Sequence, residues 1–166
     1  MSACEPANSL GSAGVVIAST RAALGVYEDK TGPIIADWLA EQGFDTSAPI
    51  VVPDGAPVGA ALRALLSQRP AVVLTSGGTG LSPTDETPEM TRPLLEREIP
   101  GIMEAIRAAG LAKTPLAALS RGYAGSNGHT LIVNLPGSPS GVMDGLAVLD
   151  PIIKHLCEQL KGGHGH

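Results

Sequence analysis

Short apolar runs alternate with stretches of helical periodicity along most of the chain. Three runs rich in Val, Ile and Leu are short enough to predict buried strands, at residues 15–18, 50–52 and 72–74. Stretches with apolar residues at helical spacing predict helices, at residues 31–39, 58–66 and 99–106. Strands that are apolar throughout and separated by helices are typical of a parallel sheet covered on both faces.

The pattern changes in the last third of the chain. Residues 116–123 and 130–135 flank Gly-Ser-Asn-Gly at 125–128, and this arrangement predicts a hairpin with its turn at those four residues. Two further helices follow. They are expected to be separated at Asp150-Pro151, because Pro cannot continue a helix, with Asp150 capping the second one.

No repeat or linker divides the 166 residues, so we expect a single domain. The predicted fold is a three-layer α/β/α sandwich with a mostly parallel sheet and a hairpin extension. It should span residues 13–161, with a flexible arm over 1–12 and a flexible tail over 162–166.

Composition narrows the class of protein. Apolar residues make up 43% of the chain but aromatic residues only 2%, so the core must consist of aliphatic side chains. A net charge of −5 with no Lys/Arg cluster argues against nucleic acid or an anionic membrane as partner. There is no signal-peptide pattern and no apolar run near the ~20 residues that span a bilayer, which predicts a cytoplasmic protein. Cys4 and Cys157 lack metal-ligand spacing and are interpreted as incidental thiols.

The most informative stretch is residues 75–89, which joins a predicted strand to a helix start. It contains Gly77, Gly78 and Gly80 among several hydroxyl side chains. Glycines allow backbone N–H groups to approach a ligand closely, and a following helix adds its positive dipole end, as in anion sites. Asp85 fits such a site if a divalent cation lies between it and a phosphate.

An ordinary tight turn is the alternative interpretation of this stretch. Thr87 would then cap the following helix, with Pro88 at its first position. That alternative explains the end of the stretch but does not require the three glycines. The P-loop lysine and the G-x-G-x-x-G spacing are both missing, so neither standard phosphate motif is matched.

The expected parallel topology places the ligand site at one edge of the predicted sheet. Ligands of parallel sheets bind beyond the carboxyl ends of the strands. The segments that follow the predicted strands are the richest in Gly, Pro, hydroxyl and acidic residues, and they are residues 19–29, 53–55, 75–86 and 134–139. The candidate site is therefore placed where these segments meet.

With these segments in view, the sequence resembles the molybdenum cofactor biosynthesis proteins of the molybdopterin adenylyltransferase type, from about Gly14 to about Lys161. The matching motifs are Ser76-Gly77-Gly78-Thr79-Gly80 with Asp85 and Thr87-Pro88-Glu89, Gly25 to Lys30, Pro53-Asp54, Leu119-Ser120-Arg121, and Asn134 to Pro139. The resemblance implies adenylylation of the terminal phosphate of molybdopterin by ATP and Mg²⁺, with release of pyrophosphate. It also implies trimers or hexamers and an interaction with the molybdate-inserting enzyme of the pathway.

The resemblance assigns site residues by position. Asp54 and Asp85 match the two acidic positions regarded as essential, and both are implied as catalytic and metal-binding residues. The implied molybdopterin- and nucleotide-binding residues are Ser76, Gly77, Gly78, Thr79, Gly80, Ser120, Arg121, Pro136, Gly137 and Ser138. For Arg121, phosphate neutralisation and an ordinary surface ion pair both remain open.

Two positions depart from the family pattern. Thr20 stands where relatives often carry Asp, and Thr84 where they often carry a basic residue. These departures favour one alternative, a non-catalytic molybdopterin-binding or carrier oligomer on the same scaffold. A second alternative is a phosphosugar- or nucleotide-binding α/β protein outside the pathway.

Overall fold

The computed structural model describes residues 9–163 of the chain. Its strands are β1 (Ser12–Ala18), β2 (Asp45–Thr46), β3 (Ile50–Val52), β4 (Val72–Ser76), β5 (Arg97–Glu98), β6 (Ala124–Asn127) and β7 (Thr130–Leu135). Its helices are α1 (Thr20–Ala23), α2 (Thr31–Gln42), α3 (Ala56–Leu66), α4 (Thr87–Thr91), α5 (Pro100–Leu111), α6 (Pro139–Leu149) and α7 (Ile153–Leu160), with the short 3₁₀ helices η1 (Arg92–Leu94) and η2 (Pro115–Leu119).

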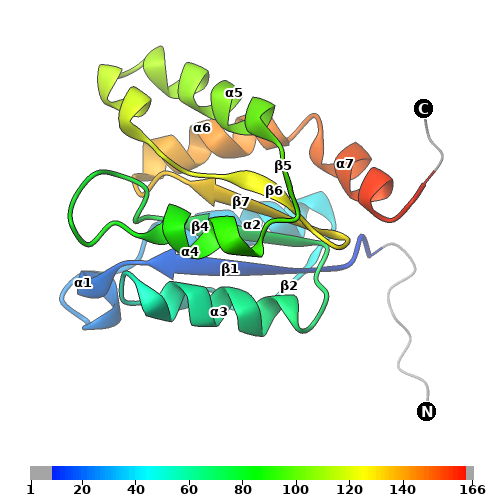
Figure 1. Ribbon diagram of the computed structural model, residues 1–166, viewed down its shortest axis with the longest axis horizontal. Coiled ribbons are helices and arrows are strands. Elements are labelled where there is room, and N and C mark those ends of the chain that lie inside the picture. The colour runs from blue at the N-terminus through cyan, green and yellow to red at the C-terminus, as the bar shows by residue number, and fades with distance from the viewer. Residues whose placement is uncertain (1–8, 164–166) are drawn as a thin grey trace.

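The strands form one seven-stranded sheet, which is mostly parallel as predicted (Figure 1). The order is β2-β1-β4-β7-β6-β5, and β3 continues the edge beside β1 after β2. β4 pairs in parallel with β1 and β7, so that Leu74 lies opposite Val15 on one side and Val133 on the other. The antiparallel strands β6 and β5 form the expected extension.

Alternate strand residues face two separate apolar clusters. Val15, Leu74 and Val133 pack with residues of α2, α5, α6 and α7. Val16 and its neighbours on the other face pack mainly with α3. Figure 1 shows α3 below the strands and α5 to α7 above them. The three-layer prediction is therefore confirmed. No helix within residues 9–163 is long and apolar enough to cross a membrane.

The first strand and the last helix lie near the two ends of the described range. β1 already begins at Ser12, and Gly162 and Gly163 continue from α7 as a turn with backbone hydrogen bonds. The rest of the expected arm and tail, including Cys4, His164 and His166, lies outside the described residues.

The hairpin is present, but its first strand and its turn were predicted at the wrong residues. Residues 115–119 form η2 instead of a strand, and Leu116 is 69% exposed, so its apolar side chain does not pack on the sheet. Gly125 lies within β6, where only glycine fits, because a Cβ at that position would be 2.2 Å from the carbonyl oxygen of Arg97 on β5. The turn is at Gly128-His129, where Gly128 has a φ of +55°.

The predicted cap of the last helix was also wrong. α7 begins at Ile153 without a side-chain cap, and Asp150 instead ends α6. Its Oδ1 accepts a hydrogen bond of 2.7 Å from Nε2 of Gln42 at the end of α2. Asp150 therefore connects two helices rather than starting a third.

Cys157 is buried in the core cluster on the α7 side of the sheet. Burial raises the pKa of its thiol from 9.0 to about 11, because an apolar environment disfavours the thiolate. This location agrees with an incidental thiol rather than a reactive one.

We expect Cys157 to react slowly with thiol reagents in the folded protein. A pKa higher by about two units lowers the thiolate fraction at pH 8 by on the order of 100-fold relative to the unfolded chain. The measurement is the labelling rate of a Cys4→Ser variant in buffer and in denaturant. Equal rates in the two conditions would contradict the burial of Cys157.

Candidate functional site

The loops after β1, β4 and β7 meet in backbone contact at one end of the sheet, on the left in Figure 1. A Cβ on Gly77 would be 2.4 Å from the carbonyl oxygen of Ala18, and a Cβ on Gly137 would be 3.3 Å from the Cα of Gly77. Ser76 is buried, and its hydroxyl donates to the Pro136 carbonyl at 2.8 Å. Glycine is required at 77 both for this contact and for its φ of +92°.

Gly78 lies between two side-chain oxygens. A Cβ there would be 2.3 Å from Oγ1 of Thr87 and 3.1 Å from Oδ1 of Asp54, and φ is +66°. The Thr87 hydroxyl is buried and makes no hydrogen bond within the described residues. The predicted side-chain cap by Thr87 is therefore wrong, since the residue before it occupies the cap position and the hydroxyl is directed at Gly78 instead.

Asp54 is held by Thr20, the first residue of α1, which follows β1. Its Oδ2 accepts from the Thr20 hydroxyl at 2.9 Å and from the Thr20 backbone N–H at 3.2 Å. The backbone N–H of Asp54 donates in turn to Oγ1 of Thr20 at 3.1 Å. Oδ1 accepts no hydrogen bond from residues 9–163, so it is available to a ligand beside Gly78.

Asp85 lies at the other end of the glycine-rich loop. Its Oδ2 accepts from the backbone N–H of Ser82 at 3.1 Å and would be 2.8 Å from a Cβ on Gly80. The two acids therefore flank the loop, Asp54 at Gly78 and Asp85 at Gly80. In the described part of the chain, no three His, Cys, Asp or Glu side chains are grouped as a metal site.

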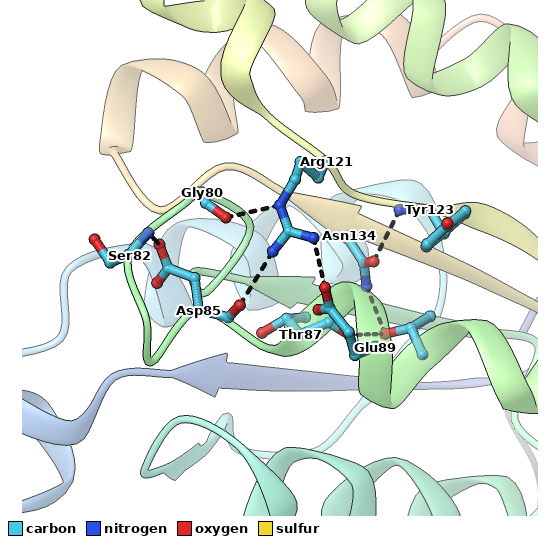
Figure 2. A network of polar contacts seen from close by, with 9 residues as sticks. Gly80, Ser82, Asp85, Thr87, Glu89, Arg121, Tyr123 and Asn134 are labelled. Atoms are coloured by element: carbon cyan, nitrogen blue, oxygen red, sulfur yellow. Dashed lines mark hydrogen bonds and ion pairs between the residues drawn. The ribbon is translucent and has the colours of Figure 1, made fainter.

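Arg121 joins the segment before β6 to the glycine-rich loop (Figure 2). Its Nε donates to the Gly80 carbonyl at 2.9 Å, Nη2 donates to the Asp85 carbonyl at 3.1 Å, and Nη1 pairs with Glu89 at the start of α4. Its backbone N–H donates to the Thr79 carbonyl at 2.9 Å. The side-chain hydrogen bond lowers the pKa of Glu89 and raises the pKa of Arg121. This geometry makes Arg121 a support of the loop.

Asn134 is a second support, and Figure 2 shows it beside Arg121, next to Tyr123. Its amide is fully buried; Nδ2 donates to the hydroxyls of Thr75 at 2.9 Å and Thr91 at 3.0 Å. Its Oδ1 accepts from the backbone N–H of Tyr123 at 2.9 Å. One side chain thus joins β7, β4, α4 and the segment before β6.

Two cavities border the glycine-rich loop. The larger has a volume of about 360 Å³, and its lining includes the predicted residues Thr79, Gly80, Ser120, Pro136 and Ser138. The smaller, of about 120 Å³, includes the predicted residues Ser76, Gly77 and Gly137. Ser138 also caps α6, because its Oγ accepts from the Gly141 N–H at 3.0 Å. The structure thus brings the sequence-predicted residues together around one loop.

Sequence reasoning missed several residues that shape the site. Thr20 was noted as a departure but not as the partner of Asp54. Glu89 was noted only as part of a motif and a helix start, and Asn134 only as part of a motif. Lys113 and Asp144, which line the larger cavity as an ion pair, gave no signal. These pairings join residues 31 or more positions apart, so no local pattern reports them.

The fold and the candidate site define an α/β protein whose strand-end loops meet at the carboxyl edge of a mostly parallel sheet. Residues 14–155 match the protein family described as "Probable molybdopterin binding domain". The chain belongs to this family of molybdenum cofactor biosynthesis.

Named relatives agree with this membership. A Synechococcus elongatus protein named "Molybdenum cofactor biosynthesis bifunctional protein" is 39% identical over 91% of this chain, which spans 48% of that protein's length. A Helicobacter pylori protein named "Molybdopterin adenylyltransferase" is 34% identical over 91% of this chain and 88% of its own. The structure of the molybdopterin biosynthesis Mog protein from Mycobacterium ulcerans superposes with a TM-score of 0.87 at 55% identity, covering 90% of this chain and 98% of that one.

Close backbone contact at Gly77 gives a prediction with an internal control. Gly77→Ala and Gly128→Ala both place a side chain at positive φ, but only Gly77 meets another backbone, since nothing lies within 4 Å of a Cβ on Gly128. We expect Gly128→Ala to lower the free energy of unfolding by about 1–2 kcal/mol. Gly77→Ala should cost about 3 kcal/mol or more, because overlap adds to backbone strain.

Urea unfolding of the two variants measures this difference. Equal losses would show that Ala18 and Gly77 are not in contact. The variants also differ in position, because Gly128 lies in the hairpin turn, away from the strand-end loops, and its replacement should leave ligand binding unchanged.

Proposed function

We propose that the chain adenylylates the terminal phosphate of molybdopterin, with Mg-ATP as the second substrate and pyrophosphate as the second product. The observation that carries the proposal is the placement of Asp54 and Asp85 at the two ends of a glycine-rich loop. Relatives named molybdopterin adenylyltransferase over most of this chain support the choice of substrate.

The reaction brings two polyanions together. A phosphate oxygen of molybdopterin attacks the α-phosphorus of ATP, a new P–O bond forms, and the bond from that phosphorus to the bridging oxygen of pyrophosphate breaks. Positioning and charge neutralisation dominate the barrier of such a transfer. The loop from Gly77 to Gly80 supplies close backbone approach, and two cavities border this loop.

The acidic residues present fit a magnesium ion. Mg²⁺ in nucleotide sites is held by one or two carboxylates together with substrate phosphates and water. Oδ1 of Asp54 accepts no hydrogen bond from the described residues, and Asp85 has only the Ser82 N–H bonded to its carboxylate. When bound, the ion would neutralise phosphate charge. Asp54 and Asp85 would hold it, while Arg121 and Thr20 fix the loop and the acid.

A non-catalytic molybdopterin carrier is the second candidate. One observation favours it: the hydroxyl and the backbone N–H of Thr20 occupy one oxygen of Asp54, where a second acid would offer another metal ligand. Incubation of the pure protein with molybdopterin, ATP and Mg²⁺ separates the two candidates. Adenylylated pterin and pyrophosphate support the enzyme, whereas pterin binding without either product supports the carrier.

We expect Asp85→Asn and Asp54→Asn to lower Mg²⁺-dependent turnover, Asp85→Asn by on the order of 100-fold or more, because charge neutralisation is worth several kcal/mol. Pterin binding by Asp85→Asn should persist, since a negative charge near a phosphate is removed. Asp37→Asn, an equal change of charge on the exposed face of α2, serves as control. An unaltered rate in Asp85→Asn would remove the metal-ligand assignment.

We also propose that the chain self-associates to a trimer or hexamer through a surface other than the strand-end loops. Analytical ultracentrifugation at micromolar concentration should give a mass of three or six chains. Addition of molybdopterin should leave that mass unchanged if the interface and the site are separate. A monomer under these conditions would contradict the proposal.

A further inference from the structure

The larger cavity has an apolar lining that could hold a ring. Its walls include the apolar side chains of Ile106, Leu116 and Leu119, from α5 and η2. At the loop end it reaches Gly80 and Ser138. A heterocycle held between the apolar walls would therefore direct an attached phosphate toward the glycine-rich loop.

One carboxylate, Asp144 on α6, lines this cavity. Its side chain is only 13% exposed, and its Oδ1 accepts from Nζ of Lys113 at 2.6 Å. Lys113 is 58% exposed, so water shares much of its charge. Oδ2 accepts no hydrogen bond from the side chains and backbone of residues 9–163. This oxygen is not fully buried, so it can accept a hydrogen bond from a donor on a ligand that enters the cavity.

Ring chemistry decides which ligand supplies that donor. A pterin presents a 2-amino group beside a ring N–H, and these two parallel donors match the two oxygens of a carboxylate. Adenine presents an amino donor beside a ring acceptor, which a carboxylate would repel. We propose that Asp144 recognises the amino edge of the pterin ring in the larger cavity and thereby selects pterin over adenine there. This inference rests on the proposed function.

Lys113 has a secondary part in this arrangement. Its ammonium group donates to Oδ1 of Asp144, but it does not contact the proposed donor edge. Removal of Lys113 therefore leaves the acceptor in place, whereas removal of the Asp144 charge replaces an acceptor with an amide that can present a donor. Both substitutions break the same ion pair. A difference between them in pterin binding therefore reports the loss of the Asp144 acceptor and not the loss of the ion pair.

The test uses 6-hydroxymethylpterin phosphate, a fluorescent pterin, and the full-length protein. Asp144→Asn should weaken its binding by about 10-fold or more, the effect of losing hydrogen bonds to a charged group. Lys113→Met should change the dissociation constant by less than about threefold. The KM for ATP should remain unchanged in both variants, because the nucleotide does not use this edge. Circular dichroism checks that both variants are folded.

Each outcome bears on a distinct claim. Equal pterin binding by the wild type and Asp144→Asn would overturn the role of Asp144 and leave the proposed function standing. A raised KM for ATP with unchanged pterin binding would place the nucleotide in the larger cavity and overturn the inference. Failure of the wild type to bind the pterin phosphate would overturn the proposed function and, with it, the inference.

Discussion

The candidate site at the carboxyl edge of the sheet depends on the contacts of one side chain, Arg121. Its guanidinium group donates to the carbonyls of Gly80 and Asp85 and pairs with Glu89, while its backbone N–H donates to Thr79. A glycine-rich loop has few side chains of its own to fix its path. A planar group with several donors can fix such a loop at several carbonyls at once. Arg121 therefore fixes the path of the loop from outside it. The directions of the loop's own backbone N–H groups depend on this support.

This use of Arg121 shapes the electrostatics of the site. The cation that could have neutralised a phosphate is engaged with Glu89 and with two carbonyls, and Asp54 and Asp85 add negative charge beside the loop. A phosphorylated ligand would therefore meet acids rather than free cations at Gly78 and Gly80. Such a site gains from a divalent cation, because the ion reverses the sign of the interaction between carboxylate and phosphate. The composition of the site and the proposed use of Mg-ATP are consistent on this point.

Much of the fold could be predicted because its strands are apolar on both faces, and such strands are specified by composition alone. The prediction of the first hairpin strand failed because Leu116 and its neighbours are apolar yet exposed, so apolar content did not indicate burial there. The location of the site followed from parallel topology, which places all strand-end segments at one edge. The hydrogen-bond partners of Arg121 could not be predicted from the sequence. Two of them are backbone carbonyls, and their positions depend on the folded path of the loop.

Hydrogen bonding distinguishes the residues that support the candidate site from the residues that are available to a ligand. Asn134 is fully buried with partners on both amide atoms, and Arg121 has a partner on each nitrogen, so both already have their contacts before any ligand binds. The Thr87 hydroxyl is buried without a partner among the described residues, and one oxygen each of Asp54 and Asp144 is unbonded there. An unpaired buried polar group costs about 1–3 kcal/mol. Among these atoms within residues 9–163, only the Thr87 hydroxyl is fully buried and carries that cost, whereas the free oxygens of Asp54 and Asp144 are open to solvent and can accept hydrogen bonds from a ligand.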